Sequence, residues 1–434
     1  MSRSWITADS GLVKAILIFM LLLPLSSTSS SGEMPEQSAA FTAEAGAPVG
    51  SPFRMENPPD YDLTNPAVAY DSFLDWYWVT TQVNSIIQKI YVTILKGKFE
   101  EMFSWPLFVA LSGQTVGNPD IAYSPFPGYF LIVWEHFDGT YNRIKGRLTS
   151  ASGPISDEIL LGTSGANDYK PAVAFASGSN KFLVVWERVV WMSGTSDIEG
   201  QVVAPDGTLV GSKFLVATGD NQFAHYEPDL AYNPSLDHYL VVWSQEYKPN
   251  SEGDIYGRRV AANGALVDPT PIPIGYYVNN ETAPAVAALQ TPSFGKYLVA
   301  WELHLSGADH DIYACAVSGT GATQTDFPIA TAIDMETNPA IASNHLRNQY
   351  LVTWTAPIPG FTNTAIWGRP VEVDGSYSGE TAYFNGLLAD HSAVSAGRSG
   401  DYLVAYQDSS LFPAGIDLWG SFWGDWIFLP LVQQ

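Results

Sequence analysis

The feature that most constrains this chain is a sequence unit that recurs seven times, at spacings of 52 to 57 residues. Its clearest copy spans residues 227–260 and contains three short apolar runs, DLAY, YLVVW and DIYGRRV. A fourth run over 271–274 follows an Asn263-Gly264 turn. Short β-branched or aromatic runs bounded by Asn, Pro, Gly or Asp are typical of β-strands. Each unit is therefore predicted to form four strands.

Three positions mark the unit along the chain. The first run opens at Pro66, Pro119, Pro171, Pro228, Pro284, Pro339 and Ser392. The second run ends at Trp134, Trp186, Trp243, Trp301, Trp354 and Tyr406 in units two to seven. The third run carries Gly146, Gly200, Gly257, Ala314, Gly368 and Gly420 in the same units.

A period of about 50 residues with four short strands is typical of a β-propeller blade. The sequence therefore predicts an all-β fold, a seven-bladed β-propeller of four-stranded blades. The small residues of the first run suit an innermost strand close to a crowded axis. The second run is apolar without alternation, which indicates that neighbouring blades cover both of its faces. Glycine inside a strand indicates close approach by another group, and we expect that group to be the Trp of a neighbouring blade.

Four segments make up the predicted domain organisation. Residues 1–31 read as a signal peptide, because a basic end precedes an apolar run over 15–25 and a Ser-rich exit. That run is short for a membrane span, so we expect a secreted or cell-surface protein without a span after cleavage; an uncleaved anchor is the alternative. Residues 32–49 are predicted to be a flexible leader, residues 50–425 the propeller, and residues 426–434 an apolar tail.

The last unit lacks room for its own fourth strand. Full units place that strand about 14 residues after their Gly, and the chain ends 14 residues after Gly420. Residues 50–56 resemble the fourth strand at 211–217, so we expect residues 51–55 to complete the seventh blade and join the two ends of the chain. The alternative is that residues 426–432 form the fourth strand of the seventh blade. If the N-terminal segment closes the ring, the tail is left to pack elsewhere or to offer an edge for oligomer formation.

Charge and cysteine content narrow the classes of partner. The formal net charge of −24 argues against nucleic acid or an anionic membrane surface as a partner. It is compatible with cation binding: we expect no cofactor, with bound Ca²⁺ as the alternative. The single cysteine, Cys315, falls in a third-strand position and is expected to be a small core residue.

Aromatic and acidic side chains gather in two loop sets that share one face of a propeller: the loops between second and third strands and the links between blades. Aromatic rings stack on sugars, and carboxylates bind hydroxyl groups or hard cations. This face is predicted to bind a carbohydrate or a protein partner. The candidate ligand-binding residues are Tyr169, Trp191, Tyr226, Glu227, Tyr276 and Tyr277.

One loop of the fifth unit carries metal-ligand residue types. His304, Asp309 and His310 lie within seven residues of one another and are the candidate metal ligands. Acidic residues also open the third strand in four units, where we expect turn caps, with calcium binding as the alternative. These four residues are Asp197, Asp254, Asp311 and Asp417.

Carboxylates directly after the second-strand Trp are the candidates for catalysis. Glu135, Glu187 and Glu302 occupy this position, and a pair of carboxylates can hydrolyse glycosides. Because the repeat generates them, and because Thr81 and Ser244 are expected at the same position, we predict a structural role and no catalytic residues. The sequence contains no G-x-S-x-G, HExxH, CxxC or Walker motif.

The combined pattern, PAVAYNP-like, YLVVW and DIYGRRV, resembles repeats of secreted bacterial β-propeller proteins over about residues 50–425. Functions in that family are largely unassigned, so the resemblance implies a fold and no site. The S-x-D-x-G-x-T-W box of sialidases and the GH…WD signature are missing. Three functions stay open: a non-enzymatic binding or surface-assembly module, which we favour; a carbohydrate-active hydrolase or lyase; and a structural subunit of an extracellular assembly.

Overall fold

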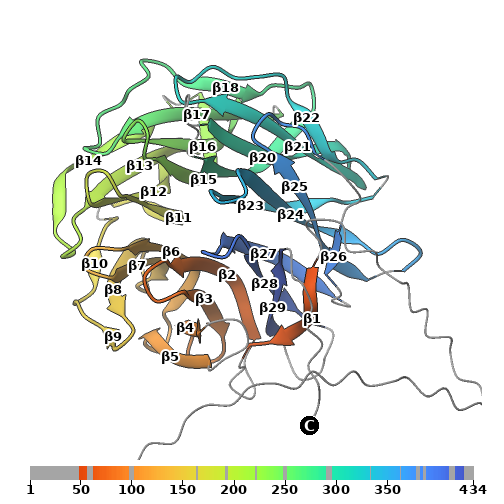
Figure 1. Cartoon of the computed structure of the whole chain (residues 1–434). Helices are drawn as coiled ribbons and strands as arrows, with labels where there is room; N and C mark the ends of the chain where they lie inside the picture. Colours follow the sequence, from red (N-terminus) through yellow and green to blue (C-terminus); the bar gives the residue numbers. More distant parts are fainter. Residues whose placement is uncertain are drawn as a thin grey trace, which may run out of the picture. The chain divides into compact units, whose positions relative to one another are not determined.

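Seven β-sheets surround a common axis, and 29 strands account for the regular structure of the described residues (Figure 1). The computed structural model describes residues 48–55, 62–96, 102–162, 165–190, 194–219, 222–247, 252–289, 296–332, 334–361, 363–377, 382–384, 388–409 and 416–424. The predicted signal peptide and C-terminal tail lie outside these ranges. The seven-bladed propeller is confirmed.

Six blades are formed by consecutive strands. Blade 1 consists of β2 (Asp62–Asp71), β3 (Trp76–Asn84), β4 (Lys89–Lys96) and β5 (Met102–Val109). Blade 2 consists of β6 (Thr115–Ser124), β7 (Tyr129–Phe137), β8 (Asn142–Ser150), the short β9 (Gly153–Pro154) and β10 (Ile159–Leu160). Blade 3 consists of β11 (Asn167–Ala176), β12 (Lys181–Val190), β13 (Thr195–Val203) and β14 (Leu209–Ala217). Blade 4 consists of β15 (Phe223–Asn233), β16 (His238–Tyr247), β17 (Gly253–Ala261) and β18 (Ile272–Gly275). Blade 5 consists of β19 (Asn280–Leu289), β20 (Lys296–Ser306), β21 (Asp309–Ser318) and β22 (Phe327–Ala330). Blade 6 consists of β23 (Thr337–Asn344), β24 (Gln349–Pro357), β25 (Thr364–Glu372) and β26 (Ala382–Phe384).

Blade 7 is assembled from both ends of the chain. It contains β27 (Ala389–Ala396), β28 (Tyr402–Asp408), β29 (Asp417–Trp423) and, as its fourth strand, β1 (Pro48–Arg54). The Met55 amide donates to the Leu418 carbonyl at 2.9 Å, and Arg54 pairs with the buried Asp417 carboxylate at 2.7 Å. This confirms closure by the N-terminal segment, and the strand begins two residues inside the segment predicted as leader.

The core is divided among the blade interfaces. Seven clusters of buried apolar residues occur, and each joins two neighbouring blades. Trp134, for example, packs with Trp78 and Ile90 of blade 1. Because each blade covers the apolar faces of its neighbours, a single blade has no core of its own.

The glycine column of the third strands has a different neighbour from the expected Trp. A side chain at Gly257 would meet Ile274 at 2.8 Å, and one at Gly200 would meet Phe214 at 3.0 Å. Both neighbours belong to the fourth strand of the same blade. The expectation of a neighbouring Trp was therefore wrong: at these two positions a fourth-strand side chain of the same blade lies over the glycine. At Gly146 the nearest side chains are Leu131 and Val133 of the second strand.

Each inner strand contains a β-bulge at its marker position. The residue before the proline, or before Ser392 in blade 7, has a φ between 44° and 53° in all seven blades. These residues are Asn65, Asn118, Lys170, Glu227, Ala283, Asn338 and His391. Left-handed backbone is costly for residues other than glycine, so contacts elsewhere must hold it in place.

Candidate functional site

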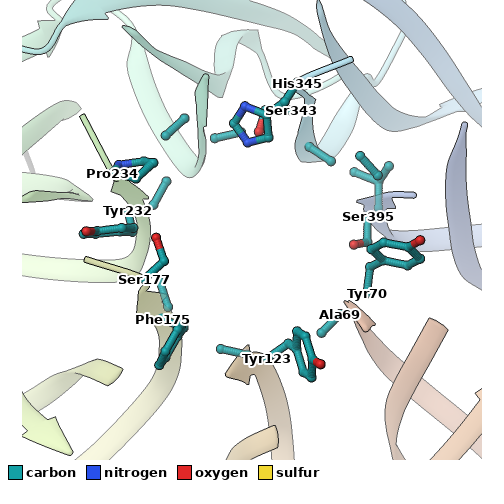
Figure 2. Close-up of a pocket in the computed structure, with 18 residues that line it drawn as sticks. Ala69, Tyr70, Tyr123, Phe175, Ser177, Tyr232, Pro234, Ser343, His345 and Ser395 are labelled. Carbon is teal, nitrogen blue, oxygen red and sulfur yellow. The ribbon is translucent and has the colours of Figure 1, made fainter. Parts of the chain in front are cut away.

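The axis holds a cavity of about 490 Å³ at the end formed by the hairpins between first and second strands (Figure 2). Small side chains such as Ala69 and Ala122 line it, as expected for inner strands. Tyr232 donates to Asp237 of its own hairpin at 2.7 Å, which fixes the ring at the rim. None of the predicted site residues lines this cavity. Its lining is supplied by the repeat, which indicates a structural origin.

The carboxylates at the opposite end of the inner strands hold the bulges. Glu135 accepts from the Lys170 amide of the next blade at 2.6 Å, and Glu302 accepts from the Asn338 amide at 2.7 Å. Gln407 accepts from the Asn65 amide at 3.2 Å across the closure of the ring. These bonds satisfy the amide of the left-handed residue, so the repeated position links successive blades.

The strand register corrects one assignment at this position. Gln82 of blade 1 pairs with Thr64, as Glu135 pairs with Gly117 in blade 2. Gln82, rather than Thr81, therefore occupies the carboxylate position in blade 1. The sequence offset arose because blade 1 has Thr81 at the position where the other blades have the aromatic residue that marks the register.

Three of the predicted ligand-binding residues gather around the buried Glu187. Tyr169 pairs with Glu187 in the strand register. Burial, with Glu227 and Glu135 nearby, raises the pKa of Glu187 to about 8. Burial, with Glu246 and Glu187 nearby, raises the pKa of Tyr226. Glu227 also accepts from the Ala283 amide at 3.0 Å. Tyr169, Tyr226 and Glu227 therefore belong to the contacts that join successive blades.

Two further predicted residues, Tyr276 and Tyr277, line a separate pocket of about 630 Å³ formed by blade 4 and its link to blade 5. The structure adds lining residues that sequence reasoning missed: Phe223, Gln245, Tyr247, Glu252, Asp254, Tyr256 and Val278. Five of them lie on β15, β16 and β17, and only the register of the blade brings those five to the link that carries Tyr276 and Val278. Trp191 lies outside the described residues.

The pocket presents aromatic surface to solvent. Tyr276 is 73% exposed and Tyr247 is 55% exposed. The Tyr247 ring meets Phe223 edge-on, with centroids 5.5 Å apart, and the Tyr277 hydroxyl donates to Asp326. These contacts fix the orientation of both rings while leaving aromatic surface uncovered.

Buried contacts hold the link in position. Glu281 is fully buried and accepts from the Trp301 indole at 3.1 Å. The Gly253 amide donates to Asn280 at 2.6 Å, which connects the link to the start of β17. A side chain at Gly275 would meet Glu281 and Trp301 at 3.0 Å or less, so only glycine fits there. The pocket wall is therefore anchored at both ends.

The carboxylate in the pocket has an altered acidity. Burial, with Glu252 nearby, raises the pKa of Asp254 to about 6.

Among the four acidic residues that open third strands, Asp197 accepts from the Gly219 amide at 2.9 Å, which is the capping contact that was expected. Asp417 instead pairs with Arg54. Burial, with Asp309 nearby, raises the pKa of Asp311 to about 6.

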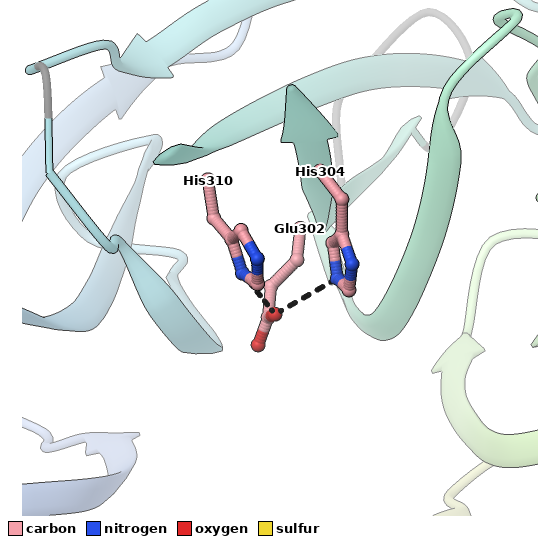
Figure 3. Close-up of side chains that lie close together, drawn as sticks. All are labelled: Glu302, His304 and His310. Carbon is pink, nitrogen blue, oxygen red and sulfur yellow. Dashed lines mark ion pairs between the residues drawn. The ribbon is translucent and has the colours of Figure 1, made fainter. Parts of the chain in front are cut away.

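The hairpin of blade 5 brings His304 and His310 together with Glu302 (Figure 3). One ligand atom from each of the three side chains lies within 4.8 Å of the others. The carboxylate of Asp309, which was expected here, does not belong to this group. Burial, with His304 nearby, lowers the pKa of His310.

Cys315 is buried, and its Sγ lies 3.2 Å from the Gln324 carbonyl.

Comparisons with known proteins show no family for this chain. No protein-family profile matches the chain, and no curated protein matches it. The β-propeller domain of the Trilobed protease from Pyrococcus furiosus is 11% identical, with a TM-score of 0.48 over 83% of this chain and 95% of that one. An α-L-arabinofuranosidase from Fusarium graminearum is 11% identical, with a TM-score of 0.46 over 77% of this chain and 99% of that one. An intramolecular trans-sialidase from Ruminococcus gnavus is 10% identical, with a TM-score of 0.44 over 83% and 94%.

The described part of the chain contains no helix that is long and apolar enough to cross a membrane. The sheet topology establishes a seven-bladed propeller, and no family is shown for the chain.

Proposed function

We propose that this chain is an exported, non-enzymatic binding propeller that takes a polyhydroxylated, carbohydrate-like ligand in the pocket between blades 4 and 5. The observation that carries the proposal is the aromatic wall formed by Tyr247, Tyr256, Tyr276 and Tyr277. Sugars present apolar C–H faces that stack on such rings, and their hydroxyl groups bond to carboxylates and amides. Glu252, Asp254 and Gln245 supply those groups at the same pocket.

Export rests on the sequence. Residues 1–31 have the charge and apolar pattern of a signal peptide, and the repeat resembles those of secreted bacterial propellers. A surface-exposed aromatic pocket on an acidic protein suits a ligand that is neutral or cationic. Assembly through residues 426–434 is a further part of the proposal, and these residues lie outside the described structure.

The binding test uses the mature chain on a glycan array, followed by calorimetric titration with the best-bound glycan. Tyr276→Ala and Tyr277→Ala should each weaken binding about tenfold, equivalent to about 1.4 kcal/mol, because each removes a stacking surface. Tyr377→Ala is the matched control, since Tyr377 is an exposed tyrosine of blade 6 outside the pocket. Unchanged affinity in both pocket variants, or no glycan bound by the wild type, would refute the site.

A carbohydrate-active enzyme is the second candidate, and the raised pKa of Asp254 favours it. A carboxyl group with a pKa near 6 beside Glu252 is suited to donating a proton to a glycosidic oxygen. Mass spectrometry of the bound glycan after incubation separates the two candidates. The binding module leaves the glycan intact; cleavage that is lost in Asp254→Asn would establish the enzyme instead.

A further inference from the structure

The hairpin of β20 and β21 carries a group of donor atoms that the carbohydrate pocket does not use. Residues two apart on a strand project from the same face, so Glu302 and His304 lie side by side on β20. His310 is the register partner of His304 on β21. Figure 3 shows the Glu302 carboxylate between the two imidazole rings.

The distances match the edges of a coordination polyhedron. Oε2 of Glu302 lies 3.4 Å from Nε2 of His304 and 3.6 Å from Nδ1 of His310. Zinc–ligand bonds of about 2.0–2.2 Å in tetrahedral geometry place ligand atoms about 3.3–3.6 Å apart. Both measured edges are within or at the limit of that range, and they are longer than a hydrogen bond.

The structural contact of Glu302 uses only one of its two carboxylate oxygens. Glu302 holds the bulge of blade 6 through Oε1, which accepts from the Asn338 amide at 2.7 Å, and this leaves Oε2 toward the histidines. Nδ1 of His310 is buried and has no hydrogen-bond partner among the described residues. A buried ring nitrogen without a partner calls for an explanation, and a bound cation supplies one.

We propose that Glu302, His304 and His310 bind one divalent transition-metal ion of the zinc class. Two imidazole nitrogens and one carboxylate oxygen form a donor set that suits zinc, cobalt or nickel better than calcium or magnesium, which prefer oxygen ligands. Three protein ligands leave at least one position open to water or to a donor atom of a ligand.

Binding requires a small rearrangement. The two imidazole rings are stacked, with centroids 3.9 Å apart and planes 11° from parallel. Because ring lone pairs lie in the ring plane, both rings must tilt to point at one ion. His304 must also release Thr282, whose Oγ1 lies 2.8 Å from Nε2. The side chain of His304 is 27% exposed, so it has room to move.

The test is a titration of the mature chain, first stripped with a chelator, with ZnCl₂ in a calorimeter and with CoCl₂ in an absorption spectrometer. We expect one ion per chain, and cobalt bands of the intensity that four- or five-coordinate sites give. His304→Ala, His310→Ala and Glu302→Gln should each weaken binding at least about 100-fold, since even the loss of an outer-shell partner costs 10- to 100-fold.

Two control variants keep the test specific. Asp309→Asn should change affinity less than about threefold, because adjacent strand residues face opposite ways and Asp309 is not a ligand. His345→Ala removes an exposed histidine at the axial cavity and should leave binding unchanged. Circular dichroism of every variant checks that the fold is retained.

The proposal is wrong if the wild type binds no zinc at one ion per chain, or if folded His304→Ala and His310→Ala variants bind as well as wild type. Glycan binding that persists in the stripped chain would leave the proposed function intact.

Discussion

Blades 2 and 5 pair their first three strands in the same register, and they use one shared position in different ways. Glu135 of blade 2 accepts both of its bonds, from the Lys170 amide and the Asn118 side chain, at Oε1. Glu302 of blade 5 makes the equivalent inter-blade bond through Oε1 and turns Oε2 toward two histidines. The difference lies two residues beyond the carboxylate on the second strand and at the residue paired with that position on the third strand, not in the carboxylate.

The register identifies the residues that make that difference. In blade 2 the pair Phe137 and Asn142 closes the hairpin, where blade 5 has His304 and His310. A metal-binding group therefore arises when two positions outside the repeat change next to a carboxylate that the repeat already supplies. Repeated residues hold the blades together, and residues that depart from the repeat are the ones to examine for function.

The largest expected effect separates the two carboxylates by metal. Zinc at 100 times its Kd should stabilise the wild type by about 2.7 kcal/mol. Glu135→Ala should keep this zinc-dependent gain, and Glu302→Ala should lose it, because only Glu302 is a ligand. Thermal unfolding with zinc and with a chelator measures both. Equal zinc responses in the two variants would show that the blades do not differ as described.

The second prediction concerns the tryptophans that precede these carboxylates. The Trp301 indole donates to the buried Glu281 at 3.1 Å, whereas the Trp134 indole nitrogen is buried without a partner in the described structure. Trp301→Phe should therefore lower the free energy of unfolding by about 1–3 kcal/mol more than Trp134→Phe, because it also leaves Glu281 unpaired. Thermal or urea unfolding of the two variants gives the comparison, and equal losses would contradict it.

The smallest expected effect is a dependence of stability on pH. Burial, with Asp254 nearby, raises the pKa of Glu281 to about 8. The folded state then binds a proton that the unfolded state releases above its lower pKa, so stability falls as pH rises from about 4.5 to about 8. In blade 2, burial raises the pKa of Asp120 to about 7, so its contribution should end at a lower pH.

Melting temperatures at pH 5.5, 7.0 and 8.5 measure this dependence. The wild type should melt highest at pH 5.5. Glu281→Gln should reduce the fall in melting temperature over the whole range up to about pH 8. Asp120→Asn should reduce this fall only up to about pH 7. A wild type that is more stable at pH 8.5 than at pH 5.5 would show that these carboxyl groups do not dominate.

The candidate sites were only partly predictable. Tyr276 and Tyr277 stood out in the sequence because they lie in a link between blades. Tyr247, Tyr256 and Phe223 could not be connected with them, since they reach the pocket from three strands of blade 4. His304 and His310 were found by residue type, but Asp309 was chosen over Glu302 because sequence proximity was used in place of strand alternation.

The sequence by itself determined the number of blades, the four strands of each blade and the closure by residues 51–55, because these depend on local pattern and on a period that repeats. Only the tertiary structure decided which side chains meet. Fourth-strand residues such as Phe214 cover the glycines, and the amide of a left-handed residue in one blade finds its acceptor in the blade before. Such contacts depend on strand register and on the packing of one blade against the next, and the sequence of a single repeat unit predicts neither.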